Sequence, residues 1–402
     1  MGEVLRRFGD EFLGRHTTRL TVTQRKVLAS LAACRTPAMG YRRWECDACG
    51  HQAMLPRSCG DRHCPQCQGS ARQRWLNQRR AELLPVDYYH VVFTVPREVA
   101  GIAAAHPRRF YTLLFRAVRE TLVEVAADGR HLGAKIGGLM VLHTWGQTLQ
   151  LHPHVHVIVP GGGLTPDGQR WVSCPPKYFL CVKVLGRVFR GKLLAFLRDA
   201  YQAGQLPFTG GLAHLAQPAR FAAWRKALFR GEWNVYCQPP CGGPERVLKY
   251  LARYTYRVAI SNDRLEAISH EGIRFRYKDY QNGGDWRSMT LSADEFLRRF
   301  AQHILPRGLV RIRSFGYLAG PRRNEQLARC RELISASGTP AATDSQVEKP
   351  ATETNEPPRC PHCQTGLLVL IEQRPRPRVP ELVGLTYQPG GLAGLTKGWN
   401  TS

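Results

Sequence analysis

The sequence has little acidic charge and no long apolar segment. Its 402 residues include 57 Lys and Arg against 31 Asp and Glu, a formal net charge of +26. No stretch approaches the ~18 uninterrupted apolar residues of a membrane-spanning helix, and the charged first residues lack the apolar core of a signal peptide. We therefore expect a cytoplasmic protein without a membrane partner. The basic excess favours a polyanion such as DNA as partner, because each neutralised phosphate releases condensed counterions.

Helical and strand-like patterns alternate irregularly along the chain, and no internal repeat is evident. Apolar β-branched runs at 88–96, 138–144 and 154–160 predict strands, and 264–291 reads as a β-meander with turns. The mixture predicts an α+β fold with a central antiparallel sheet and flanking helices. We expect an N-terminal helix and zinc-binding domain at 1–70, followed by a basic helix at 71–86 and a catalytic domain at 87–330. A disordered polar linker is expected at 335–358, and a tail at 359–402.

The 13 cysteines indicate metal binding and not disulfides, because clustered CxxC pairs in a reducing compartment are typical metal ligands. Two such pairs are separated by 14 residues. Four thiolates close a tetrahedral shell, so they predict one structural Zn²⁺ that folds the segment and does not catalyse. The predicted ligands are Cys46, Cys49, Cys64 and Cys67, with Cys59 and His63 as alternates and Cys34 as a further surplus cysteine.

Near the end of the sequence, Cys360 and Cys363 form another CxxC pair, which stands alone. Half a site cannot complete a tetrahedron. This pair needs Cys330, His362 or another part of the chain as partner, or it is an unused remnant.

A basic helix is predicted directly after the cysteine-rich segment, at 71–84. Basic side chains interleaved with an aromatic suit a DNA groove or an unstacked base, although a solvated basic face has the same pattern. The candidate DNA-binding residues are Arg72, Arg74, Trp75, Arg79 and Arg80.

The run from Leu151 to Pro160 carries three alternating histidines. In a strand, His152, His154 and His156 share one face, while the valines between them face a core. Neighbours on one face lie about 6.6 Å apart, a span that two imidazoles can close around one cation. His154 and His156 are therefore the predicted ligands of a divalent Lewis-acid ion.

Two imidazoles do not complete a metal site. Gln147, seven residues upstream of His154, is the first choice for a third ligand. His143 and His152 compete with it.

Tyr250 and Tyr254 are spaced i and i+4, which places both phenols on one face of a helix predicted over 245–255. A phenol is a poor nucleophile unless cations lower its pKa or a metal polarises the target. Lys249 and Arg253 supply positive charge nearby and are further candidate DNA-binding residues. By themselves these tyrosines fit ordinary core packing better than catalysis, and only the histidine strand reverses that interpretation.

Several motifs in one order give the sequence a specific resemblance over roughly residues 10–330. The sequence resembles the rolling-circle insertion-sequence transposases of the HUH nuclease class, in the group with a zinc-ribbon N-terminus. The motifs that carry the resemblance are RSCGDRHCPQCQG (57–69), HVVFTVP (90–96), LHTWGQTLQLHPHVHVIVPGGGL (142–164), KYLARYTYRVAISNDRL (249–265) and LPRGLVRIRSFGYLAG (305–320).

The resemblance implies a HUH endonuclease fold in which His154 and His156 bind Mg²⁺ or Mn²⁺. It implies that Tyr250 and Tyr254 attack single-stranded or melted DNA at the ends of a mobile element, and that cut strands are joined to target DNA through a 5′-phosphotyrosine. Both tyrosine positions are filled, as in the two-tyrosine branch. Which tyrosine attacks first does not transfer.

Three other functions compete with this interpretation. A rolling-circle replication initiator or relaxase would use the same chemistry on another substrate. A histidine-triad nucleotidyl hydrolase or transferase would use a histidine nucleophile, without tyrosine or divalent metal. A zinc-dependent DNA-binding protein without catalysis would leave the histidine strand unexplained.

Overall fold

The computed structural model describes residues 1–238, 259–280, 282–337 and 358–377. The chain forms two compact units, each built from separate stretches of sequence. The first unit is formed by Met1–Ser70, Val258–Ile304 and Lys349–Ser402, and the second by Ala71–Arg257 and Leu305–Glu348. No helix within the described ranges is long and apolar enough to cross a membrane.

Three helices form the core of the first unit: α1 (Gly2–Arg15), α2 (Val22–Ala33) and α9 (Ala293–Ala301). Thr21 begins α2 with a complete capping box, in which Thr21 and Gln24 satisfy each other's backbone amides. His16, after α1, lies 2.9 Å from Asp294 of α9. The first and last thirds of the chain therefore fold together in this unit.

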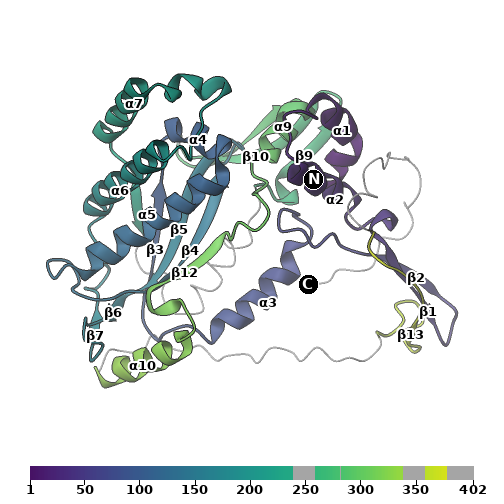
Figure 1. Cartoon of the computed structure of the whole chain (residues 1–402). Coiled ribbons are helices and arrows are strands. Elements are labelled where there is room, and N and C mark those ends of the chain that lie inside the picture. The colour runs from purple at the N-terminus through teal and green to yellow at the C-terminus, as the bar shows by residue number, and fades with distance from the viewer. Residues whose placement is uncertain (239–258, 281, 338–357, 378–402) are drawn as a thin grey trace. The chain divides into compact units, whose positions relative to one another are not determined.

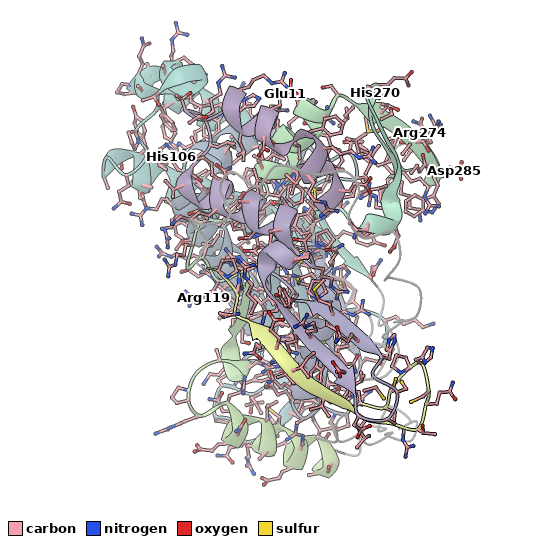
Figure 2. All side chains as sticks on the ribbon, turned by 90° about the vertical axis from the view of Figure 1, so that its right-hand side faces the viewer. Glu11, His106, Arg119, His270, Arg274 and Asp285 are labelled. Carbon is pink, nitrogen blue, oxygen red and sulfur yellow. The ribbon has the colours of Figure 1, made fainter. Side chains whose placement is uncertain are left out.

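The first unit also holds two three-stranded antiparallel sheets. One has the order β13-β1-β2, from Leu368–Arg374, Tyr41–Cys46 and Gln52–Pro56. The other is the predicted meander, with β9 (Leu265–Ser269), β10 (Gly272–Asp279) and β11 (Asp285–Leu291) in the order β11-β10-β9. Figure 2 labels His270, Arg274 and Asp285 on this meander.

The second unit is built on a five-stranded sheet with the order β12-β4-β5-β3-β8. Figure 1 labels β3, β4, β5 and β12 of this sheet. All its strand pairs are antiparallel. The strands are β3 (Tyr88–Thr94), β4 (Gly138–Trp145), β5 (Leu151–Pro160), β8 (Val235–Gln238) and β12 (Ile312–Phe315). β5 is the central strand, as the resemblance implied.

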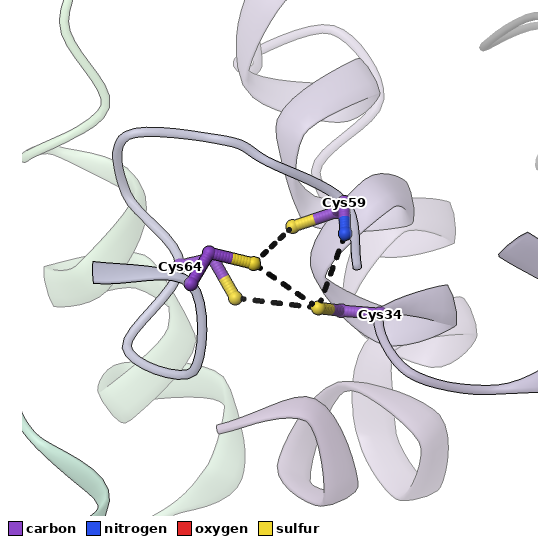
Figure 3. A group of neighbouring side chains, drawn as sticks. Cys34, Cys59 and Cys64 are labelled. Atoms are coloured by element: carbon purple, nitrogen blue, oxygen red, sulfur yellow. Dashed lines mark hydrogen bonds between the residues drawn. The ribbon is translucent and has the colours of Figure 1, made fainter. Parts of the chain in front are cut away.

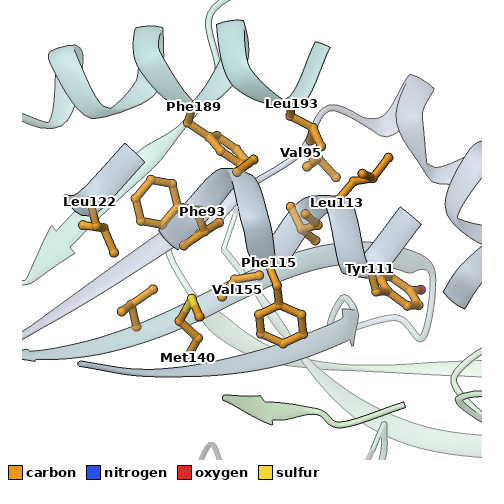
Figure 4. Close-up of a cluster of buried hydrophobic side chains, with 14 of the residues drawn as sticks. Phe93, Val95, Tyr111, Leu113, Phe115, Leu122, Met140, Val155, Phe189 and Leu193 are labelled. Carbon is orange, nitrogen blue, oxygen red and sulfur yellow. The ribbon is translucent and has the colours of Figure 1, made fainter. Parts of the chain in front are cut away.

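One face of this sheet packs against long amphipathic helices to form the main core (Figure 4). Val155, Val157 and Val159 of β5 are fully buried in it. Phe93 of β3 meets Phe189 edge-on, with ring centroids 5.1 Å apart. The helices of this unit are α3 (Gln68–Arg80), which begins just before the unit's boundary, α4 (Ala100–Ala105), α5 (Pro107–Ala127), α6 (Val182–Gln202), α7 (Pro218–Arg230) and α10 (Arg323–Ala336).

The opposite face of the sheet carries the histidines. At one end of this face, Tyr88 and Ile158 pack against Leu327 and Cys330 of α10. The short elements complete the described chain: β6 (Gly162–Leu164), β7 (Trp171–Ser173) and the 3₁₀ turns Pro37–Met39, Arg97–Val99, Gly210–Ala216, Asn262–Arg264 and Gly316–Leu318.

The predicted fold class is confirmed: a central antiparallel sheet with flanking helices follows a cysteine-rich N-terminal region. The helix expected at 245–255 and most of the linker expected at 335–358 lie outside the described residues.

Candidate functional site

The histidine face is set by strand register. His154 and His156 share a face of β5, as predicted, because Val155 between them is buried in the core on the other side. His143 of β4 pairs directly with His154 across the β4–β5 ladder. Directly paired residues of an antiparallel ladder point to the same face. The hairpin therefore brings a third imidazole to the predicted pair.

The three imidazoles form a compact cluster. Each offers one ring nitrogen, and these three atoms lie within 4.8 Å of one another. His143 and His156 are buried, with 2% and 7% of their surface exposed, whereas His154 is half-buried. Burial lowers the pKa of His154 to about 4. At neutral pH its ring is thus uncharged, which is the form that binds a cation.

A hydrogen bond orients His154. Its Nδ1 lies 2.7 Å from the backbone carbonyl oxygen of His152. Since a carbonyl only accepts, Nδ1 carries the proton and Nε2 keeps its lone pair. Metal-binding histidines commonly donate their second ring N–H to such an acceptor.

A second chain of hydrogen bonds reaches His156 through a residue that sequence reasoning missed. His90 of β3 places its Nε2 2.7 Å from Nδ1 of His156, and its Nδ1 lies 3.2 Å from Oε1 of Gln238. The Gln238 oxygen accepts from His90 Nδ1, so His90 Nε2 accepts from His156 Nδ1. This arrangement directs the lone pair of His156 Nε2 toward the cluster.

His90 is suited to this neutral relay. It is 3% exposed, and burial lowers its pKa to about 4, with the Gln238 hydrogen bond acting in the opposite direction. The signal in the sequence was a histidine at the start of the apolar strand HVVFTVP. Nothing local to that strand shows that it pairs with β5.

The donor set fits a divalent transition-metal cation. Three imidazoles on one sheet leave the other coordination positions of an ion open. Mg²⁺ prefers oxygen ligands, whereas imidazole nitrogen binds Mn²⁺ and later transition metals more readily. Of the two predicted cations, the imidazole group therefore favours Mn²⁺.

The candidates for the third ligand occupy different places. Gln147 lies in the turn from Gly146 to Gln150 between β4 and β5. His152 is exposed on β5 and is absent from the three-imidazole group. His143, which competed with Gln147 in the sequence, is the residue that the ladder places beside His154 and His156.

One cysteine cluster lies in the first unit, between the end of α2 and the start of α3 (Figure 3). Its shortest sulfur–sulfur distances are 3.5 and 3.6 Å. A disulfide needs about 2.05 Å, while Zn–S bonds of about 2.3 Å in a tetrahedron place sulfurs about 3.8 Å apart. This geometry fits zinc. Its members are Cys34, Cys59, Cys64 and Cys67.

The predicted grouping of the N-terminal cysteines is wrong. Cys46 and Cys49 do not join Cys64 and Cys67; they gather with Cys360 and Cys363 in a second cluster of four. The cause is the β1–β2 hairpin. It begins after Cys34, and β1 leads the chain to Cys46 and Cys49 at the far end of the hairpin, where β13 also begins.

The fold also shows where the surplus residues of the sequence lie. Cys34 and Cys59 complete the first cluster, whereas Nδ1 of His63 lies 2.8 Å from Asp61 and His63 belongs to neither cysteine group. Cys330, one suggested partner of the C-terminal pair, is buried in the apolar core beneath α10 in the second unit.

The basic helix α3 is present, but its predicted residues differ in exposure. Arg72, Arg74 and Arg80 are exposed. Arg79 forms an ion pair with Glu82 at 2.8 Å, and Trp75 packs against the core beneath α10. The three exposed arginines are thus the better candidates for DNA contact. Tyr250, Tyr254, Lys249 and Arg253 lie outside the described residues.

Comparison with known proteins gives two matching family models and two close relatives. The model described as "Transposase zinc-binding domain" matches residues 4–95, and the model described as "Putative transposase" matches residues 137–326. "Putative transposase y4qJ" of Sinorhizobium fredii is 46% identical over 92% of this chain and 94% of its own length. The "Transposase for insertion sequence element IS801" of Pseudomonas savastanoi is 27% identical, over 84% of this chain and 81% of its own length.

Among solved structures, the conjugative relaxase TrwC in complex with OriT DNA is similar to this chain at 13% sequence identity. The similarity covers 62% of this chain and 71% of the relaxase chain. The TM-score of 0.24 is too low to carry an argument. The family assignment rests on the sequence relatives and family models. The chain belongs to the IS91-type rolling-circle insertion-sequence transposases with an N-terminal zinc-binding domain.

Proposed function

We propose that this transposase cuts and rejoins single DNA strands through a divalent cation held by His143, His154 and His156. The observation that carries the proposal is the imidazole cluster, whose three donor atoms lie within 4.8 Å of one another on a rigid sheet. A cation bound there would act as a Lewis acid and withdraw charge from the scissile phosphate. His90 and Gln238 keep His156 in the tautomer that leaves Nε2 ready to bind.

Tyr250 or Tyr254 is the proposed nucleophile. The phenolate oxygen attacks phosphorus, the bond from phosphorus to the 3′ oxygen breaks, and the released 3′ oxygen takes up a proton. The product is a 5′-phosphotyrosine and a free 3′-hydroxyl. The positive charge of Lys249 and Arg253, which flank the pair in the sequence, is proposed to stabilise the phenolate. Because the phosphodiester energy is conserved, attack by a 3′-hydroxyl on the phosphotyrosine rejoins DNA without a nucleotide cofactor.

The proposed substrate is single-stranded or melted DNA at the ends of an insertion sequence, together with target DNA. The net charge of +26 favours a polyanion. The exposed arginines of α3, Arg72, Arg74 and Arg80, follow directly after the zinc-binding cysteines and are proposed to contact the DNA backbone. Both relatives are named as transposases. This favours a transposase over a replication initiator or relaxase.

The test is covalent capture of DNA. Labelled single-stranded end DNA is incubated with the full chain and Mn²⁺, and the adduct is mapped by mass spectrometry. We expect the adduct on Tyr250 or Tyr254, and we expect its loss with EDTA or in the Tyr250→Phe/Tyr254→Phe variant. Tyr256→Phe, which removes a third phenol two residues beyond Tyr254 in the sequence, is the matched control and should retain the adduct.

Two results oppose the proposal. An adduct on a histidine that survives in the Tyr250→Phe/Tyr254→Phe variant would support the histidine-triad mechanism instead. Formation of the tyrosine adduct in EDTA at the full rate would show that the imidazole cluster does not act through a cation.

A further inference from the structure

The second cysteine cluster has the dimensions of a zinc site. The Sγ atoms of Cys46 and Cys363 are 3.6 Å apart, and those of Cys49 and Cys360 are 3.8 Å apart. All four sulfurs lie within 4.8 Å of one another. These distances match the edge of a zinc–thiolate tetrahedron, about 3.8 Å, and are far longer than a disulfide bond of about 2.05 Å.

The two halves of this cluster have the same turn. After Cys49, the amide of Gly50 donates to the carbonyl oxygen of Cys46 at 3.0 Å, and Gly50 has a φ of 69°. After Cys363, the amide of Gln364 donates to the carbonyl oxygen of Cys360 at 2.9 Å, with a φ of 61°. A non-glycine residue rarely adopts this left-handed conformation. Two segments far apart in the sequence thus form matching knuckles.

The C-terminal knuckle is shaped around sulfur. The amides of His362 and Gly366 point at Sγ of Cys360 and of Cys363, at 3.4 and 3.3 Å. Such donors stabilise a thiolate. A Cβ atom on Gly366 would lie 2.5 Å from Sγ of Cys46, so only glycine permits the two knuckles to approach this closely.

Apolar packing contributes little at this end of the sheet. The local cluster has three buried members, Cys46, Cys360 and Leu368. Along β13, Val369 and Ile371 are 51% and 45% exposed. A core of this size does not hold a strand in place by itself, and small modules of this kind are commonly stabilised by a bound metal.

We propose that Cys46, Cys49, Cys360 and Cys363 bind a second structural Zn²⁺, separate from the ion of Cys34, Cys59, Cys64 and Cys67. The zinc-binding family model ends at residue 95 and therefore contains only half of this site. The ion joins Cys49 to Cys360 across 311 residues of chain. It holds the C-terminal segment as the third strand of an N-terminal sheet, where Glu372 contacts Tyr41 at 2.6 Å and Arg43 at 2.9 Å.

The first test counts zinc by mass spectrometry of the full chain, in a His143→Ala/His154→Ala/His156→Ala background so that the imidazole cluster adds no ion. We expect two zinc ions per chain. Cys360→Ser/Cys363→Ser and Cys46→Ser/Cys49→Ser should each remove one ion, and combining them should remove no more. Cys330→Ser, which changes a buried cysteine outside both clusters, should keep two.

Two zinc ions retained in Cys360→Ser/Cys363→Ser would overturn the proposal, because Cys46 and Cys49 would then bind elsewhere. The proposal would also be overturned if each double variant lost one ion and the combined variant lost both. The two cysteine pairs would then bind different ions.

A second test measures directly whether the C-terminal segment stays attached to the rest of the protein. A site for a specific protease is inserted between Ser337 and Pro358, and the cut protein is run on a sizing column without denaturant. We expect the C-terminal fragment to elute with the rest of the chain when all cysteines are present, and to separate in Cys360→Ser/Cys363→Ser. The joining role would be refuted if the C-terminal fragment stayed with the rest of the chain equally in wild type and in Cys360→Ser/Cys363→Ser, or if it separated from the cut wild-type protein.

Discussion

His90 provides a sharp test of how the imidazole centre is oriented. His90→Ala removes the acceptor that lies 2.7 Å from Nδ1 of His156. Without it, this hydrogen bond no longer favours the His156 tautomer that carries its proton on Nδ1. Loss of such a supporting hydrogen bond weakens metal binding by about 10- to 100-fold, or about 1.4 to 2.8 kcal/mol. His90→Gln places an amide oxygen near the former Nε2 and should retain most of the affinity.

The assay is Mn²⁺ binding, followed by the paramagnetic resonance signal of the free ion. His303→Ala is the matched control, because it removes an equally buried imidazole from the first unit, at 4% exposure. We expect weaker binding in His90→Ala than in wild type, His90→Gln or His303→Ala. Wild-type affinity in His90→Ala, or equal losses in the Ala and Gln variants, would refute the relay.

Four further predictions follow from the site and the fold. Metal-free protein should become less stable as the pH falls from 6.5 toward 4. The pKa of His90 is about 4 in the folded protein against 6.5 in the unfolded chain, so the unfolded chain binds more protons in this window. The contribution of neutral His90 to the free energy of unfolding is therefore present in full only above pH 6.5. Thermal unfolding of wild type and His90→Gln measures this, and equal pH slopes would contradict it. Metal affinity should rise from Mg²⁺ to Mn²⁺ to Co²⁺ in calorimetric titrations, as three imidazoles dictate; tighter binding of Mg²⁺ would be inconsistent with an imidazole site. Phe93→Ala, which empties a fully buried ring position, should destabilise the second unit by about 3–5 kcal/mol in urea unfolding; a loss below 1 kcal/mol would speak against the packing shown in Figure 4. Replacing Arg72, Arg74 and Arg80 by Ala should weaken the salt dependence of single-stranded DNA binding. The slope of the logarithm of the binding constant against the logarithm of the salt concentration should decrease in magnitude by about 0.7 for each lost phosphate contact. An unchanged slope would show that α3 does not contact the DNA.

The local parts of the site were predictable from the sequence. Alternation along β5 is a property of neighbouring residues, so it placed His154 and His156 together on the face away from the core before any fold was known. The position of His143 depends on structure beyond its neighbours in the sequence. His143 reaches His154 only through the register of the β4–β5 hairpin, which is fixed by the turn from Gly146 to Gln150 and by an irregularity between His143 and Trp145.

The cysteine clusters show the same limit more strongly. CxxC spacing identified three cysteine pairs, Cys46/Cys49, Cys64/Cys67 and Cys360/Cys363, because a knuckle is formed within four residues. It did not show which pairs share a cluster, nor that the single cysteines Cys34 and Cys59 complete the cluster of Cys64 and Cys67. Cys49 and Cys360 are separated by 311 residues and meet only because β13 adds to β1. His90 was missed for a related reason, since its partner lies on another strand, 66 residues away.

The most direct test of the central claim is the Mn²⁺ concentration that half-saturates formation of the tyrosine–DNA adduct. It is measured for wild type, His143→Ala, His154→Ala, His156→Ala and Gln147→Ala, with one labelled DNA. The three-imidazole centre predicts that each histidine variant needs much more Mn²⁺ or forms no adduct, while Gln147→Ala behaves as wild type. A wild-type response in His143→Ala together with loss of the adduct in Gln147→Ala would contradict the account.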